Sequence, residues 1–293
     1  MTGTPGHLKT VKTVRKTGSL AAPPLQPQQF TTTLLAEHSS HTNRDRTGKI
    51  RLNKYIAHAG ICSRREADSY IASGKVQVNN KVCTEMGVQV SPNDKVTVDG
   101  QRIAPEPFVY FLMNKPRDTI TTTSDEKGRK TVMDLVENAT GLRVYPVGRL
   151  DRNTTGLILL TNDGDLANRL MHPSYKVRKV YEVETHRELT DEELTKLRTG
   201  IELEDGPAKA YRVSRHPAFL NVVTLSMHEG RNRVVRRMME SLGIEVVRLD
   251  RVTYGPLHKK GLRVGRWRNL RKHEINELRK MVRLLPLDHP EHR

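Results

Sequence analysis

Five apolar stretches beyond residue 107 constrain the fold most strongly. They read FVYFLMNKP, GLILLT, RKVYEVE, VVTLSM and EVVRLDRV, and their β-branched and aromatic content is typical of strands. Short helical patterns lie near residues 131–138, 164–172, 190–199 and 231–243. Because the strands are grouped rather than alternating strictly with helices, the order predicts an α+β domain around a largely antiparallel or mixed sheet.

A second pattern precedes this domain. From residue 50 there are two short helical patterns, and Ser63 and Glu66 have the spacing of a capping box at the start of the second. The stretches VQV and KVC follow, separated by two asparagines that favour a hairpin turn. Arg64 and Arg65 would oppose the dipole in the first turn of that helix, and a bound phosphate backbone would explain them.

The chain divides into three expected segments. Residues 1–48 are rich in Thr, Pro, Gln and Lys without a hydrophobic period, which predicts a disordered basic N-terminal arm. An organelle transit peptide has a similar composition, so organelle targeting is an alternative to a plain cationic arm. Pro105 and Pro107 are typical of a linker, and folded domains are expected at 49–102 and 108–285.

The charge balance points to a polyanionic partner. The chain has 50 Lys and Arg against 33 Asp and Glu, a net charge of +17. Its two cysteines, Cys62 and Cys83, support neither a disulfide framework nor a zinc site, so a reducing cytoplasm is expected. The longest apolar run, 108–113, is far shorter than the roughly 20 residues of a membrane span. We therefore expect no membrane partner, no metal and no cofactor.

One charged cluster stands at the edge of an apolar stretch. The sequence VGRLDRNTTG places Asp151 between Arg149 and Arg152, immediately before LILLT. Aspartate side chains are ordinarily carboxylates at neutral pH, and neighbouring guanidinium groups orient them. Asp151 is thus a candidate nucleophile, although this peptide alone favours a structural ion pair at a strand end.

Longer motifs favour the interpretation of Asp151 as a nucleophile over that of a structural ion pair. Residues 51–81, RLNKYIAHAGICSRREADSYIASGKVQVNNK, resemble the small RNA-binding module first known from ribosomal protein S-four. The stretches FLMNKPRDTITTTSDEKGRKTVMDL, VYPVGRLDRNTTGLILLTNDGDLANRLMHP and HEGRNRVVRRMMESLG resemble, in order and spacing, motifs of the rRNA pseudouridine synthases of the RsuA/RluB type. The resemblance implies an S-four-type domain followed by a pseudouridine synthase catalytic domain.

The resemblance also implies roles for single residues. Asp151 would attack the target uridine, so that uracil detaches, turns and rejoins ribose through carbon 5. Tyr181 would stack on the flipped uracil and help to remove the carbon-5 proton, Arg236 would pair with the aspartate, and Arg149 would fill the space that the base leaves. The family usually has Gln or Glu where Val234 stands, so any polar role at that position is lost or moved to another residue. Whether the aspartate adds to the anomeric carbon, promotes glycal formation or adds to the pyrimidine stays open.

Cations in the matched stretches are expected to contact RNA. They are Arg51, Lys54, Arg64, Arg65, Lys115, Arg149, Arg233 and Arg237. The segment 255–273 adds seven Lys and Arg without an acid, and Trp267 among them could stack on a base. A solvated basic face is the plainer interpretation of that segment.

The expected function is isomerisation of a specific uridine in ribosomal RNA, by a monomer that binds a stem-loop or a pre-ribosomal particle. The basic arm and the stretch TTTSDEKGRKTVMDL favour large-subunit over small-subunit rRNA. A non-catalytic rRNA-binding or ribosome-assembly factor is one alternative. An N-glycoside hydrolase is another, but such enzymes ordinarily need a second acid as proton donor, and Asp163 and Asp165 resemble turn and helix-cap residues.

Overall fold

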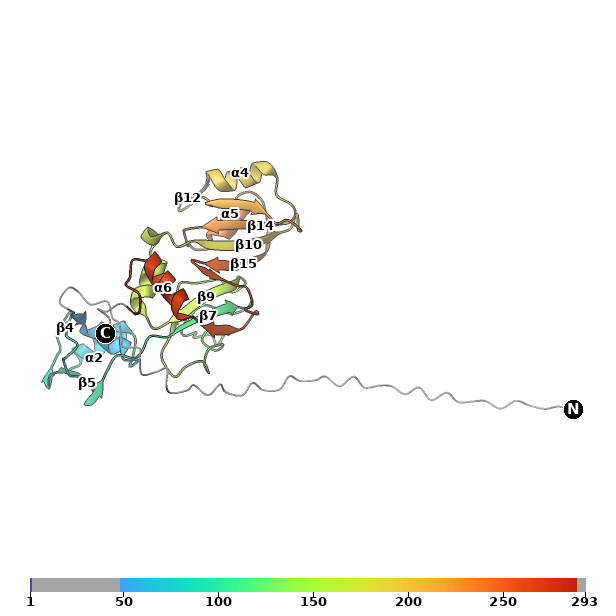
Figure 1. The fold of residues 1–293 in the computed structure, drawn as a ribbon. Helices are drawn as coiled ribbons and strands as arrows, with labels where there is room; N and C mark the ends of the chain where they lie inside the picture. Colours follow the sequence, from blue (N-terminus) through green and yellow to red (C-terminus); the bar gives the residue numbers. More distant parts are fainter. Residues whose placement is uncertain (2–47, 289–293) are drawn as a thin grey trace. The chain divides into compact units, whose positions relative to one another are not determined.

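The computed structural model describes the whole chain except residues 2–47 and 289–293 (Figure 1). The arm expected at residues 1–48 therefore lies almost entirely outside the described residues. A small module ends at Ile103, and a larger domain begins near Phe108.

The small module contains two helices and six short strands. In chain order they are β1 (Ile50–Arg51), α1 (Leu52–His58), α2 (Arg64–Ala72), β2 (Val76–Val78), β3 (Lys81–Val82), β4 (Gln89–Val90), β5 (Val96–Val98) and β6 (Gln101–Ile103). Four strands form an antiparallel sheet in the order β3-β2-β5-β6, and β1 pairs with β4. One apolar core joins helices and sheet, and it includes Leu52, Ile56, Ala67, Ile71, Val76 and Val96.

Local signals in the sequence explain this module. The capping box at α2 is confirmed: the Glu66 N–H donates to Ser63 Oγ at 3.2 Å, and the Ser63 N–H donates to Glu66 Oε2 at 2.7 Å. The turn between β2 and β3 is confirmed as well. Asn79 and Asn80 have φ values of 51° and 64°, the left-handed pair that a tight hairpin turn needs.

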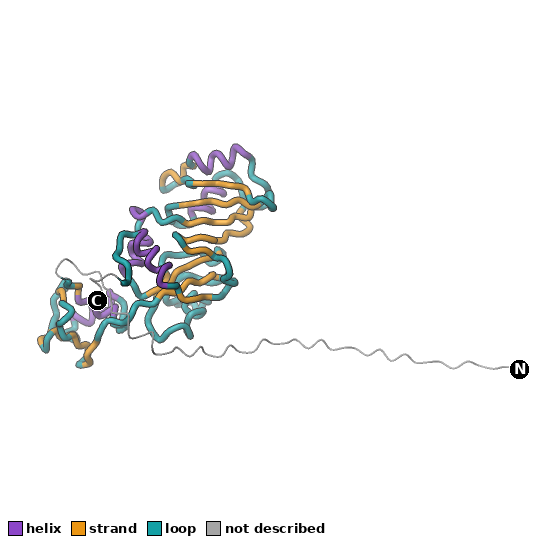
Figure 2. Tube along the Cα trace, in the orientation of Figure 1, coloured by secondary structure: helices purple, strands orange, loops and turns teal. Residues whose placement is uncertain are grey.

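The larger domain is built around a nine-stranded sheet. Its main path has the order β13-β14-β10-β15-β9-β7-β17, with β16 paired to β15 and β8 to β9 (Figures 1 and 2). The strands are β7 (Tyr110–Lys115), β8 (Tyr145–Pro146), β9 (Thr155–Thr161), β10 (Lys179–Thr185), β13 (Arg212–Arg215), β14 (Val222–Met227), β15 (Val246–Tyr254), β16 (Leu257–His258) and β17 (Trp267–Asn269). The β9–β15 pair is parallel and the other pairs are antiparallel, so the mixed sheet is confirmed.

Both faces of this sheet are buried, which explains the continuous apolar runs of β7 and β9. Phe111 and Met113 of β7 point into one core, and Tyr110 and Leu112 into another. Helices α4 (Asp191–Thr199) and α5 (Val234–Glu240) pack in the first core; α3 (Gly164–Met171) and α6 (Lys272–Met281) pack in the second. The 3-10 helix η2 (Pro173–Tyr175) and the hairpin of β11 (Ile201–Leu203) and β12 (Gly206–Ala208) complete the domain.

Two of the expected helices differ from the structure. Residues 131–138 form turns rather than a helix. There Thr131 Oγ1 accepts from the backbone N–H groups of Met133 and Asp134, and Asp134 Oδ2 accepts from the Thr131 N–H at 2.7 Å. Thr131 and Asp134 thus make the reciprocal bonds of a capping box, as Ser63 and Glu66 do at α2. The backbone bonds that follow span three residues, from the Val136 N–H to the Met133 carbonyl oxygen and from the Ala139 N–H to the Val136 carbonyl oxygen, so the segment continues as turns. The helix expected at 231–243 is shorter, because Arg233 has a left-handed φ of 48° and α5 begins only after it.

The sheet has a narrow seam between β9 and β15. Only two residue pairs join these strands, Asp250 with Thr155 and Arg251 with Gly156. Side chains reinforce the seam: Thr155 Oγ1 donates to Asp250 Oδ1 at 2.9 Å, and Arg251 Nε donates to the Leu157 carbonyl oxygen at 2.7 Å. The seam connects the strand that follows Asp151 with the half of the sheet that contains Tyr181.

A substitution at Gly156 tests how closely β9 and β15 approach each other. Its φ is 109°, and a Cβ atom there would lie against the backbone O and N of Arg251. We expect Gly156→Ala to lower the free energy of unfolding by about 3 kcal/mol, because it adds both backbone strain and overpacking. Urea denaturation measures this change. Gly141→Ala is the matched control, since no atom lies within 4 Å of the added Cβ; equal stabilities of the two variants would refute the close approach.

Candidate active site

Asp151 lies in the loop that leads into β9, and this loop is fixed on both sides. Thr121 Oγ1 donates to the Leu150 carbonyl oxygen at 2.9 Å and accepts from the Leu150 N–H at 3.2 Å. The Thr154 N–H donates to the Asp151 carbonyl oxygen at 3.0 Å. The Asp151 side chain retains 31% exposure. A solvent-accessible carboxylate therefore stands on a well-anchored backbone.

Tyr181 lies in the middle of β10, between Leu225 of β14 and Arg251 of β15. It is buried, and it belongs to the same apolar core as Leu150 and Val234. That shared core gathers the residue before Asp151, the tyrosine and the first residue of α5. The catalytic residues implied by the sequence motifs thus come from both sides of the seam.

Two arginines of the α5 region lie near Asp151. Arg233 Nη1 is 4.0 Å from Asp151 Oδ2, and Arg233 Nη2 is 3.2 Å from Glu240 Oε1. Arg236 Nη1 donates to the Val246 carbonyl oxygen at 3.2 Å, while its buried Nε has no partner within the described residues. Burial and then the Arg233 charge lower the pKa of Arg236, and Asp151 opposes this shift. The ion pair within 4.0 Å is thus with Arg233, whereas the hydrogen bond of Arg236 is to the Val246 carbonyl oxygen.

Arg237 is bound elsewhere. Its Nη1 and Nη2 form a bidentate pair with Asp205 Oδ1 and Oδ2 at 2.8 and 2.9 Å, and its Nε donates to the Asn232 carbonyl oxygen at 2.9 Å. Arg231 binds the same carboxylate at 2.9 Å. These bonds fasten the loop before α5 to the turn between β11 and β12, which leaves Arg237 little freedom to contact RNA.

Lys115 is an interior residue rather than a surface cation. It is 0% exposed, and its Nζ donates to the carbonyl oxygens of Pro116, Thr119 and Arg152 at 3.0, 2.7 and 3.2 Å. Burial lowers the pKa of Lys115 to about 8, and the Asp151 charge opposes this shift. Lys115 therefore ties the end of β7 to the residue that follows Asp151.

The arginines that flank Asp151 in the sequence point outward. Arg149 is exposed. Arg152 is exposed too, and its Nε binds Asp118 Oδ1 at 2.6 Å. Neither is shown paired with Asp151, so the flanking cations in the sequence are not the cations that lie closest to the carboxylate.

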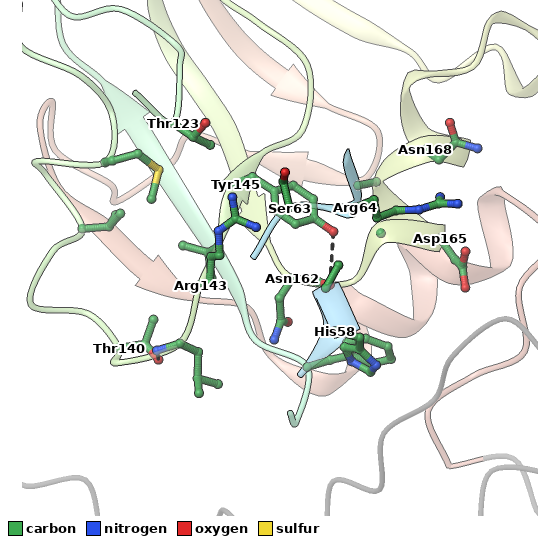
Figure 3. A pocket seen from close by; sticks show the side chains of 18 of the residues that line it. His58, Ser63, Arg64, Thr123, Thr140, Arg143, Tyr145, Asn162, Asp165 and Asn168 are labelled. Atoms are coloured by element: carbon green, nitrogen blue, oxygen red, sulfur yellow. Dashed lines mark hydrogen bonds between the residues drawn. The ribbon is translucent and has the colours of Figure 1, made fainter. Parts of the chain in front are cut away.

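The candidate RNA-binding cations of the small module differ in their surroundings. Arg51, Arg64 and Arg65 are exposed, whereas Lys54 Nζ binds Asp165 Oδ1 at 2.7 Å. Lys54 and Arg64 line a cavity of about 960 Å³, whose other residues include His58, Arg143, Tyr145 and Asn162 (Figure 3). Asp151, Tyr181 and Arg236 do not line this cavity.

The comparisons with known proteins agree with a chain made of a small module and a larger domain. A family model described as RNA pseudouridylate synthase matches residues 109–241, and one described as S4 domain matches residues 50–96. A Bacillus subtilis protein named ribosomal large subunit pseudouridine synthase B is 48% identical over 236 residues, which cover 79% of this chain and 96% of that protein. The chain belongs to the RNA pseudouridine synthase family. The family resemblance and the two-part fold expected from the sequence are confirmed.

Further relatives of this pseudouridine synthase agree. The protein of the same name from Shigella flexneri is 41% identical, covering 80% of this chain and 84% of that one. A crystal structure of a pseudouridylate synthase superposes with a TM-score of 0.56 at 29% identity, covering 78% of this chain and 99% of the other. The expected enzyme class, an isomerase, is confirmed, while the roles of Asp151, Tyr181 and Arg236 stay predictions.

Two further structural observations concern other kinds of site. Among the described residues, no group of three or more His, Cys, Asp or Glu is placed to hold a metal ion. No helix in the same part of the chain is long and apolar enough to span a membrane.

The neighbouring arginines of α5 give a test of the site. We expect Arg236→Met to slow the single-turnover rate about 100-fold, because a charged donor beside the reacting carboxylate stabilises the transition state. RNA affinity should change only a few-fold, since Arg236 is partly buried. Rates and dissociation constants measured on the same RNA separate the two effects.

Arg237→Met is the matched control. It should lower the thermal unfolding midpoint through loss of the Asp205 pair and leave the rate at saturating RNA near that of the wild type. A slow Arg237→Met with a normal Arg236→Met would show that the roles of the two arginines are reversed.

Proposed function

We propose that this pseudouridine synthase isomerises one uridine of large-subunit ribosomal RNA, in the bacterial-type cytoplasm. The relatives from Bacillus subtilis and Shigella flexneri both carry large-subunit names. The net charge of +17 suits a polyanionic substrate, and the small module supplies exposed Arg51, Arg64 and Arg65 to bind an RNA stem-loop.

One observation carries the proposal. The half-exposed carboxylate of Asp151 stands at the edge of an apolar core that contains Tyr181, with Arg233 and Arg236 nearby. A uracil extracted from the stack would lie against the tyrosine ring with its ribose beside the carboxylate. The arginine charges would stabilise the ionised Asp151 and compensate the phosphates next to the target.

The reaction needs only groups that this arrangement supplies. The bond from the anomeric carbon to ring nitrogen 1 breaks, and a bond from that carbon to carbon 5 forms. One proton leaves carbon 5 and one is gained at nitrogen 1, so the product is an isomer of the substrate. Asp151 acts as the nucleophile, Tyr181 holds the detached ring and helps to remove the proton, Arg236 orients the carboxylate, and Arg149 fills the vacated space.

The two acids considered as proton donors for the hydrolase alternative, Asp163 and Asp165, are both bound to other groups. Burial raises the pKa of Asp163, as a general acid would require. However, Asp163 is 1% exposed, and its carboxylate accepts from Arg279, Tyr110 and the Leu166 N–H. Asp165 is bound to Lys54. Neither acid is placed to protonate a leaving base beside Asp151.

Asp151→Asn tests the proposed function. We expect it to reduce pseudouridine formation by more than about 10³-fold, because it removes the nucleophilic charge with little change in volume. RNA affinity should stay within a few-fold of the wild type. The measurement is pseudouridine mapping in large-subunit and small-subunit rRNA transcripts after incubation with each protein.

The other outcomes separate the alternatives. Pseudouridine only in the small-subunit transcript would contradict the proposed substrate. An abasic product would indicate a hydrolase, and unchanged RNA bound by wild-type protein would indicate an assembly factor.

The small module has its own prediction. If Arg64 and Arg65 contact phosphates, the double variant Arg64→Ala/Arg65→Ala should reduce the slope of log affinity against log salt by about 0.7 to 0.9 per lost contact. Fluorescence titrations at several salt concentrations measure this slope. Arg198→Ala, an exposed arginine of α4, is the control and should leave the slope unchanged; an equal effect of both variants would argue against specific docking by the module.

A further inference from the structure

One aromatic ring near the active site is unusually exposed. Tyr211, the residue before β13, is 74% exposed, although its backbone is well fixed: its N–H donates to the Ser226 carbonyl oxygen at 2.7 Å. Its ring meets His228 edge to face, with centroids 5.1 Å apart and planes at 69°. Trp267, the ring that the sequence favoured for stacking, instead packs edge-on against Phe111 at 5.3 Å.

His228 is held in place from two sides. Its Nδ1–H donates to the Lys176 carbonyl oxygen at 2.6 Å, and its own carbonyl oxygen accepts from Lys179 Nζ at 3.1 Å. The ring that supports Tyr211 is therefore oriented by the protein.

The Tyr211–His228 pair lies near the residues proposed to act in the reaction. Lys179 is two residues before Tyr181 on β10, and at about 3.4 Å per residue the two lie about 7 Å apart along one face of the strand. The loop that begins at His228 ends at Arg233, which is within 4.0 Å of Asp151. A strand of RNA with its target base over Tyr181 would therefore pass close to Tyr211.

The surrounding charge suits such a strand. Lys209 and Arg212 flank Tyr211 in the sequence, and Lys176 and Arg178 precede β10; all four are exposed. The nearby acid Glu229 is paired with Arg231 at 2.6 Å, so its charge is compensated. Exposed aromatic rings among cations are typical of surfaces that bind unpaired nucleotides, because every base has a face that can stack.

We propose that Tyr211, supported by His228, is a stacking platform for an unpaired nucleotide next to the target uridine. The proposal rests on the proposed function, since it assumes an RNA substrate with its target at Asp151. Its position near the active site distinguishes the Tyr211 ring from Phe219, which lies in the loop at the opposite end of the β13–β14 hairpin. Phe219 is also exposed, at 58%, and also contacts a histidine, His216, at 5.0 Å.

Ring substitutions test the platform. Stacking of a base on an aromatic side chain contributes about 1–3 kcal/mol, so Tyr211→Ala should weaken RNA affinity roughly 5- to 150-fold. The KM should rise, with kcat at saturating RNA little changed. Tyr211→Phe, which keeps the ring, and Phe219→Ala, the matched control, should both bind within about two-fold of the wild type. Unfolding midpoints confirm that all variants are folded.

An abasic scan then identifies the stacked nucleotide. The probe is a short stem-loop of large-subunit rRNA that contains the modified uridine, with each neighbouring base removed in turn. Wild-type protein should lose affinity at one neighbouring position, and Tyr211→Ala should show no further loss there. Independent losses at every position, or unchanged affinity of Tyr211→Ala, would overturn the platform.

The two proposals can fail separately. Loss of affinity in Tyr211→Ala with no pseudouridine made by the wild type would support RNA stacking and reject the proposed function. Normal affinity and KM of Tyr211→Ala in an active enzyme would reject the platform and leave the proposed function intact.

Discussion

The parallel contact between β9 and β15 is the constraint on which the active site depends. Asp151 stands before β9, whereas Tyr181 and the α5 arginines belong to the other half of the sheet. Only two residue pairs join the halves. Three features therefore fix the position of Asp151 relative to Tyr181: the lack of a side chain at Gly156, the Thr155–Asp250 hydrogen bond and the Arg251 bond to Leu157.

The same region concentrates positive charge in the interior. Burial lowers the pKa of both Lys115 and Lys179 to about 8, and the Arg251 charge contributes to each shift. Their ammonium groups are nevertheless satisfied by backbone carbonyls, so the protein compensates much of the cost of burying them. In the described part of the chain, Arg236 Nε and Arg251 Nη2 have no hydrogen-bond partner. An anionic carboxylate and an anionic substrate suit such a site.

The sequence predicted what local patterns determine. The capping box of α2, the asparagine turn and the apolar runs of β7 and β9 follow from short-range chemistry, and the family motifs indicated the enzyme class. The sequence did not predict contacts between distant residues. It placed Lys115 and Arg237 among RNA-binding cations, but the Arg152 carbonyl that Lys115 binds and the Asp205 carboxylate that Arg237 binds come from other segments.

The same limit applies to aromatic residues. Trp267 lies among arginines in the sequence, yet β17 pairs with β7 and turns the ring onto Phe111. Tyr211 also lies among cations in the sequence, Lys209 and Arg212, and it stays exposed beside the edge strand β13. The turns at 131–138 show the limit of a local signal, because Thr131 and Asp134 make the bonds of a capping box and yet no α-helix follows.

A crystal structure of the protein with its substrate stem-loop would show where the target base binds. We expect the target nucleotide to be turned out of the stack, with its uracil against the Tyr181 ring and its ribose beside the Asp151 carboxylate, over the seam between β9 and β15. A target base bound instead in the cavity lined by Lys54, Arg64 and Tyr145, with Asp151 remote from the RNA, would contradict it.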